Sequence, residues 1–148
     1  MSTLKKKHGV IEGDHITLLN IFNIYSSKKS EGERQAFCRE IQLNDKNIQK
    51  AIKIKAILKG YLKQLGVTIK KSDDYDDPEA ILKSLITGFF GNVAQRQSDG
   101  TYRNIRSKAD EALDIHPSSV LSNIKPKWVL YNEVVVTSKK YMREVSSI

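Results

Sequence analysis

The hydrophobic pattern changes its period once along the chain, near Gly100, and this change limits the folds open to it. Before that point apolar residues recur every three or four positions, the spacing typical of one face of an α-helix. After it, short runs rich in β-branched and aromatic residues are separated by polar turns, which is typical of strands. Helices first and strands second predict an α+β fold.

Cap and turn residues divide the first part into helices. Asp14 is a good N-cap for a helix that follows it, and Asn44 or Asp45 caps a long helix over residues 46–65. Asp77-Pro78-Glu79 is a strong helix start, and the apolar spacing carries that helix to Val93. The long helix has an apolar stripe that further apolar residues widen, so we predict that it packs on two neighbours. The stripe is Ala51, Ile54, Leu58, Tyr61 and Leu65, and the residues that widen it are Ile48, Ile52 and Leu62.

Strands are predicted over residues 101–106, 112–116, 127–137 and 140–145. Several short strands joined by polar turns are typical of a small antiparallel β-barrel. We therefore expect a helical subdomain over residues 1–97 and a small barrel over residues 98–148.

The formal net charge is +8, and residues 1–74 hold 15 Lys and Arg against 8 Asp and Glu. A basic surplus of this size favours a polyanion partner, most often a nucleic acid, although Lys-rich solvated helix faces also produce it. Lys55, Lys59 and Lys63 form one such row, either a phosphate contact or a solvated face.

Motifs for catalysis and metal binding are missing from the sequence, which has no GxxxxGK[ST], CxxC or HExxH. The three histidines are scattered, so no metal site and no catalytic residue is expected. Cys38 is the only cysteine, which fits a reducing compartment and a buried side chain. No apolar run approaches the roughly 20 residues of a membrane span, so no membrane partner is expected.

Several longer words occur in one order along residues 8–148. They are Glu12-Gly13-Asp14-His15, Gly88-Phe89-Phe90-Gly91-Asn92-Val93-Ala94, Thr101-Tyr102-Arg103, Ile115-His116-Pro117-Ser118-Ser119-Val120-Leu121, Trp128-Val129-Leu130-Tyr131-Asn132-Glu133 and Ser138-Lys139-Lys140-Tyr141-Met142-Arg143-Glu144-Val145. Together they closely resemble the C-terminal region of DEAH-box RNA helicases.

The resemblance implies part of a ratchet-like helical domain followed by an oligonucleotide-binding (OB) fold, truncated at its C-terminus because family members continue past the position of Ile148. It implies an intracellular, nuclear or nucleolar protein of RNA processing. Its partners would be single-stranded RNA, helicase motor domains and protein activators. ATP and Mg would belong to motor domains absent from this chain, so the chain itself would carry no cofactor.

The candidate RNA-binding residues lie in the expected barrel: Tyr102, Arg103, His116, Ser118, Ser119, Lys139, Lys140, Tyr141 and Arg143. Basic and aromatic side chains suit single-strand binding, although most of the aromatic residues of the barrel, Trp128 above all, are expected in the core. One alternative is a structural module that docks on the motor and recruits activators without touching RNA. A second is a small hydrolase built on Ser118 and His116, for which no acid is positioned by spacing. Asp14 is interpreted as a helix cap.

We predict that the isolated chain does not hydrolyse ATP, because it carries neither a phosphate-binding loop nor a DEAH box. The measurement is phosphate release by the purified chain with and without oligo-U. Turnover above background that survives the removal of contaminating ATPases would contradict this prediction.

Overall fold

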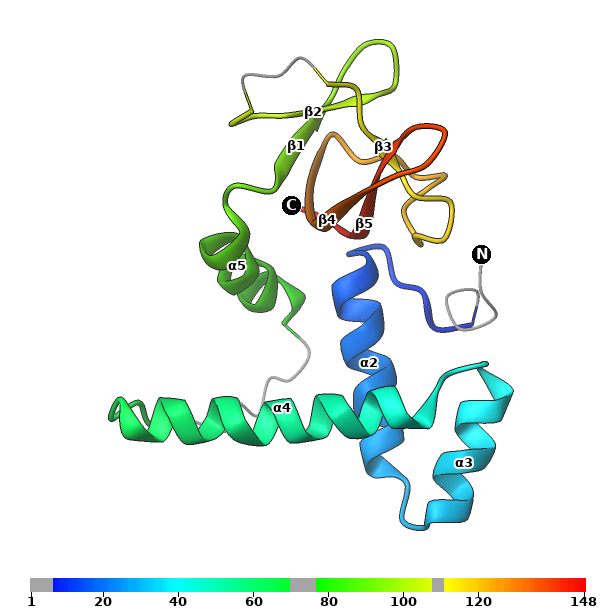
Figure 1. Cartoon of the computed structure of the whole chain (residues 1–148), viewed down its shortest axis with the longest axis vertical. Helices are drawn as coiled ribbons and strands as arrows, with labels where there is room; N and C mark the ends of the chain where they lie inside the picture. The colour runs from blue at the N-terminus through cyan, green and yellow to red at the C-terminus, as the bar shows by residue number, and fades with distance from the viewer. Residues whose placement is uncertain (1–6, 70–76, 108–110) are drawn as a thin grey trace. The chain divides into compact units, whose positions relative to one another are not determined.

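The computed structural model describes residues 7–69, 77–107 and 111–148, and in them helices α2 to α5 precede strands β1 to β5 (Figure 1). This confirms the α+β order read from the sequence. The chain forms two compact units, one holding the residues up to Asn23 and from Asp77 onward, the other holding Ile24–Asp76. These units do not coincide with the expected helical subdomain and barrel, which meet between residues 97 and 98. That division stays a prediction. None of the described helices is long and apolar enough to cross a membrane.

Helices α2 (Asp14–Ser27), α3 (Glu31–Glu40) and α4 (Asp45–Gln64) follow one another along the chain. Asn44 caps α4 as expected, because its side-chain oxygen accepts a hydrogen bond of 3.0 Å from Lys46 N. In the unit formed by Ile24–Asp76, the Tyr25 hydroxyl donates to Asp45 Oδ1 over 2.6 Å and accepts from Gln49 Nε2 over 2.7 Å. Cys38 is buried as expected, and burial raises the pKa of its thiol.

The apolar stripe of α4 is not packed as the sequence predicts. Ile48 is the only residue of α4 that is buried, whereas Ile54, Leu58 and Tyr61 are more than half exposed. The hydrogen bonds from Tyr25 reach only the first turns of the helix, so α4 extends beyond this partner. The spacing identified the helix correctly, but it could not show what covers its apolar face.

Helix α5 (Pro78–Phe89) begins as predicted, with Asp77 Oδ1 accepting from Glu79 N over 2.9 Å. It ends four residues earlier than the sequence suggests, and strand β1 (Val93–Arg96) begins where the helix was expected to finish. Two glycines weaken the end of the helix, and Val93 and Ala94 instead become buried in the sheet.

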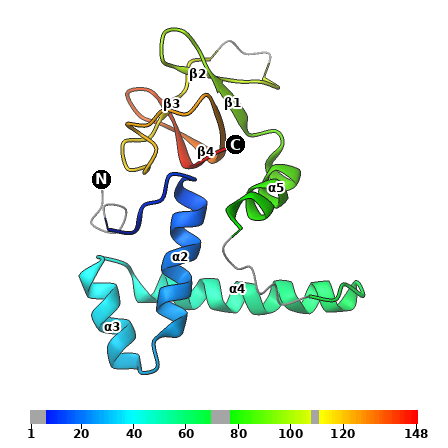
Figure 2. The same cartoon turned by 180° about the vertical axis from the view of Figure 1, so that it is seen from behind.

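The remaining strands are β2 (Tyr102–Asn104), β3 (Asp114–Ile115), β4 (Trp128–Val136) and β5 (Lys140–Ser147). They form one curled sheet in the order β2-β1-β4-β5-β3, which Figure 2 shows from the opposite side. The pairs are antiparallel except for β3 and β5, which are parallel. A bridge between Tyr102 and Leu113 joins β2 to the start of β3, so the two edge strands meet.

The core lies inside this curled sheet. It consists of buried side chains from every strand and from the turn before β4, namely Ala94, Tyr102, Leu113, Ile115, Leu121, Val129, Tyr131, Met142 and Val145. Tyr102 is fully buried, and its hydroxyl donates to the Pro126 carbonyl over 2.6 Å. Burial raises the pKa of Tyr102 to about 12, although the nearby Arg96 acts in the opposite direction.

We predict that Tyr102 makes stability depend on pH in the alkaline range. The unfolded chain releases the phenol proton near its ordinary pKa of 10.0, whereas the folded chain holds it to about pH 12. The stabilising contribution is therefore complete below pH 10 and is lost as the pH rises from 10 to 12.

In Tyr102→Phe the free energy of unfolding should fall by about 1 kcal/mol at neutral pH, because the hydrogen bond is lost. It should then decline less steeply than the wild type above pH 10. Urea unfolding at several pH values measures both effects, and Tyr61→Phe, at an exposed tyrosine on α4, is the control. Parallel pH curves for the wild type and Tyr102→Phe would refute the prediction.

Candidate nucleic-acid interface

The side chain of Asp14, in the first turn of α2, binds two distant segments of the chain, the turn after β3 and strand β5. Its side chain is completely buried, with Oδ1 accepting from Val120 N over 3.0 Å and Oδ2 accepting from Val145 N over 2.9 Å. These partners lie 106 and 131 residues away in the sequence. Asp14 opens α2, but the interpretation as a local helix cap did not foresee these long-range bonds of both carboxylate oxygens.

The residues around Asp14 lie along β5 and form an isolated β-bridge with it. Gly13 bridges Ser146 in antiparallel fashion, and Ser147 N donates to the Glu12 carbonyl over 3.0 Å. A Cβ on Gly13 would lie 2.6 Å from Ser146 Cα, and the φ of Gly13 is +114°, so both space and backbone favour glycine. His15 Nδ1 lies 2.8 Å from Ser146 Oγ. We call Glu12–His15 with its partners on β5 the clasp.

Glu144 has an unusual backbone conformation at the point where β5 meets the clasp. Its φ of +46° is unusual for a residue other than glycine. Before it, the Met142 carbonyl accepts from His116 N at the β3 side, and after it the Val145 amide faces Asp14. One edge of β5 is thus shared between β3 and the clasp.

The segment after β3 carries the His-Pro-Ser-Ser word and is held by the same carboxylate. Ser118 N donates to His116 Nδ1 over 3.1 Å, and Ser118 Oγ lies 2.7 Å from the same nitrogen. Because Nδ1 accepts from a backbone N–H, the ring proton of the neutral histidine sits on Nε2. The ring of His116 meets that of Tyr141 edge to face, with centroids 5.6 Å apart.

Two of the candidate RNA-binding residues belong to the interior. Tyr102 has no exposed face on which a base could stack. Ser119 is 1% exposed, and its Oγ accepts from Leu121 N over 3.2 Å within the turn. Tyr102 was a candidate because its ring could stack on a base, and Ser119 because its loop could offer hydroxyls to phosphates. The sequence held no signal of which side of a three-residue strand or a tight turn faces the core.

The lysines at the start of β5 are paired with acids from the β3 region. Lys139 Nζ lies 3.2 Å from Asp114 Oδ2, and Lys140 Nζ lies 2.6 Å from Glu111 Oε1. The hydrogen bond that Lys139 donates to the Asp114 carboxylate raises the pKa of Lys139. Sequence reasoning missed both acids, because the parallel pairing of β3 with β5 that brings them together has no local signal.

The structure therefore brings four of the nine candidates to one surface, which we call the loop–strand surface: His116, Ser118, Lys139 and Tyr141. Lys140 follows in the chain but lies on the other face of β5, where it lines a hollow with Glu111, Asn104 and Tyr131. Arg143 lies farther along β5 opposite Glu133, and Arg103 lies on β2. Tyr102 and Ser119 are buried.

Comparison with known proteins agrees with this geometry. Residues 81–148 match the model of the oligonucleotide/oligosaccharide-binding (OB)-fold family. The chain is 42% identical over 144 residues to the human probable ATP-dependent RNA helicase DHX35, covering 97% of this chain and 20% of that protein. The chain belongs with the OB-fold region of DEAH-box RNA helicases.

Two further relatives support the family. The mouse ATP-dependent RNA helicase DHX33 is 34% identical over 145 residues, covering 98% of this chain and 20% of that protein. The Arabidopsis thaliana pre-mRNA-splicing factor ATP-dependent RNA helicase DEAH10 is 32% identical over 157 residues, covering 99% of this chain and 21% of that protein. The chain thus spans about a fifth of the length of these DEAH-box relatives.

The loop–strand surface of this OB-fold region gives the hydrolase alternative no support. A serine nucleophile needs a histidine oriented by an acid, and no carboxylate in the described part of the chain is hydrogen bonded to His116. In the same residues, no group of three His, Cys, Asp or Glu side chains could hold a metal ion.

We predict that removing the Asp14 carboxylate loosens the clasp and the His116 loop together. Asp14→Ala leaves the Val120 and Val145 amides without this acceptor, so the free energy of unfolding should fall by roughly 2–4 kcal/mol. Asp14→Asn keeps one side-chain acceptor, so its free energy of unfolding should lie between those of the wild type and Asp14→Ala. The measurements are urea unfolding and hydrogen exchange at the two amides.

Asp77→Ala is the matched control, because the Asp77 carboxylate caps only its own helix and its loss should cost about 1 kcal/mol. The prediction is contradicted if Asp14→Ala is as stable as Asp77→Ala and both distant amides stay protected from hydrogen exchange. The clasp would then contribute nothing to stability.

Proposed function

We propose that this chain is an accessory part of an ATP-dependent DEAH-box RNA helicase that binds single-stranded RNA and couples it to motor domains. ATP and Mg would be bound by those motor domains, outside the chain. The OB-fold match and the relatives named as ATP-dependent RNA helicases support this reading. The name of the plant relative, a pre-mRNA-splicing factor, supports a nuclear location and a role in RNA processing.

The observation that carries the RNA-binding proposal is the loop–strand surface. It offers phosphate oxygens the Lys139 ammonium and the Nε2–H of His116, beside the ring of Tyr141, while Ser118 Oγ donates to His116 Nδ1. Cations beside an aromatic ring are typical of grooves that follow a single strand without reading its sequence.

The ion pairs of Lys139 and Lys140 do not prevent phosphate binding. The Lys139 side chain is 66% exposed, and exposed ion pairs contribute only about 0–1 kcal/mol. A phosphate can therefore take the place of Asp114 at little cost, while binding is still reduced by the acid nearby. Asp114 and Glu111 would act as competitors that keep affinity moderate.

The same ion pairs favour the alternative function to some degree. Lysines already neutralised by Asp114 and Glu111 also suit a protein-docking surface that packs on the motor domains or recruits an activator without touching RNA. The salt dependence of RNA binding separates the two functions, because only phosphate contacts release counterions from the RNA.

We predict that Lys139→Ala/Lys140→Ala weakens binding to oligo-U and flattens the plot of log K against log salt. Each phosphate contact on a single strand contributes a slope of about −0.7, so losing two contacts should change it by about 1.4. In the opposite direction, Asp114→Asn releases Lys139 and should tighten binding and steepen the slope.

The matched control is Lys59→Ala/Lys63→Ala, which removes the same charge from the exposed row on α4. If this control changes the slope and the β5 variant does not, the RNA contacts lie on α4. If the wild-type chain binds oligo-U with no salt dependence, the docking alternative replaces RNA binding.

A further inference from the structure

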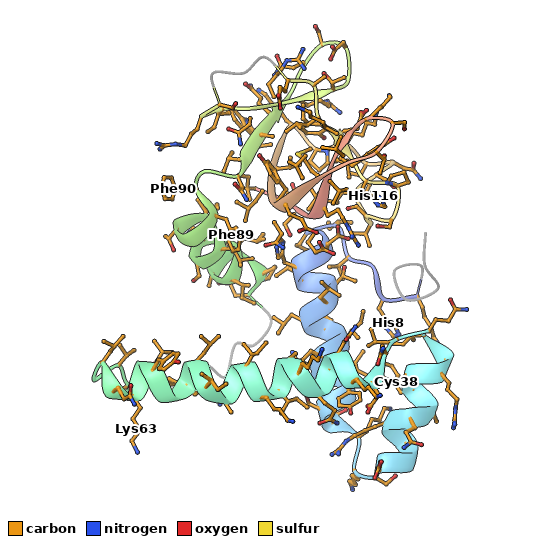
Figure 3. All side chains as sticks on the ribbon, in the orientation of Figure 1. His8, Cys38, Lys63, Phe89, Phe90 and His116 are labelled. Atoms are coloured by element: carbon orange, nitrogen blue, oxygen red, sulfur yellow. The ribbon has the colours of Figure 1, made fainter. Side chains whose placement is uncertain are left out.

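The junction between α5 and β1 presents an aromatic ring to solvent. Phe90 follows the last residue of α5 and is 55% exposed, and Figure 3 shows it pointing outward from the helix end. The neighbouring Gly91 has no atom within 4 Å of the position a Cβ would occupy, so the space beside the ring is open.

Arg106 lies over this ring. Its guanidinium carbon is 5.0 Å from the Phe90 centroid, within the range of a cation–π contact. Both residues are exposed, so the pair leaves an open aromatic face and an open guanidinium face. Ile105, next to Arg106 in the chain, is also 54% exposed.

Asn104 holds the pair in place with its whole side chain. Oδ1 accepts from Arg106 N over 2.8 Å and from Ser107 N over 2.9 Å, which fixes the turn that carries Arg106. Nδ2 donates to the Gly91 carbonyl over 2.8 Å and to the Tyr131 hydroxyl over 2.6 Å, which ties the turn to the junction after Phe90 and to β4. The pair is therefore preorganised before any ligand arrives, which lowers the entropy lost on binding.

We propose that Phe90 and Arg106 form a stacking platform for a base of single-stranded RNA, with Asn104 as its positioning residue. An exposed phenyl ring beside a guanidinium gives a π-face that any base can use and a cation for the adjoining phosphate. This inference rests on the proposed function and adds a second contact point to it. In Figure 3, Phe90 and His116 lie on opposite sides of the sheet, so the platform is distinct from the loop–strand surface, while Lys140 lines a hollow together with Asn104 and Ser107.

The test uses the full chain and two RNA probes, oligo-U and the same strand with one 2-aminopurine. Phe90→Ala should weaken binding about five-fold or more, the loss expected for one stacked base. It should also abolish the quenching of 2-aminopurine fluorescence and leave the salt slope unchanged. Arg106→Ala should weaken binding and reduce the salt slope by about 0.7. Phe90→Tyr keeps the ring and should restore both affinity and quenching.

Two controls match these variants. Ile124→Ala shortens another apolar residue of the same unit, 53% exposed, and Arg39→Ala removes one positive charge from an exposed site on α3. Neither should change quenching. If Phe90→Ala binds with full affinity and full quenching while Lys139→Ala/Lys140→Ala weakens binding, the platform is refuted and the proposed function stands. A wild-type chain that binds neither probe overturns both.

Discussion

The buried carboxylate of Asp14 is the interaction on which the arrangement of the sheet depends. A charged group with no solvent contact is tolerated only when hydrogen bonds replace its water, and here amides of the His116 loop and of β5 supply them. An apolar residue at this place could fill the space, but it could not fix the register of three segments at once. Asp14 thus contributes specificity more than net stability, the role best established for buried polar groups.

The clasp also explains two unusual backbone conformations. Gly13 must approach the backbone of β5 more closely than any side chain allows, and Glu144 must adopt a positive φ for the Val145 amide to face the carboxylate. Each strained position costs free energy, and such strain persists where surrounding contacts determine it fully. The two conformations are complementary halves of one contact, formed by residues 131 positions apart.

Local signals predicted the elements well, whereas packing between elements stayed out of reach. The Asp77 cap followed by Pro78 placed the start of α5 correctly, because cap and helix are neighbours in the chain. The end of α5 was misplaced, since helical spacing runs on from Phe89 to Val93 and β1, four residues long, is too short to show its own period. The stripe on α4 and the burial of Tyr102 depend on partners far along the chain, which a pattern of spacing does not contain.

The two surfaces proposed for RNA share one principle of construction. On the loop–strand surface, the backbone of the His116 loop is held by Asp14, and at the α5–β1 junction the turn that carries Arg106 is held by Asn104. In both cases an inward-facing polar side chain uses its hydrogen-bonding groups to fix backbone, and the residues left facing solvent are the cations and aromatic rings. Because side chains beneath the surface fix the backbone of these loops, the exposed groups keep their positions when no RNA is bound. Rigid presentation of this kind suits the proposed binding of a single strand without reading its sequence, because binding then orders only the RNA.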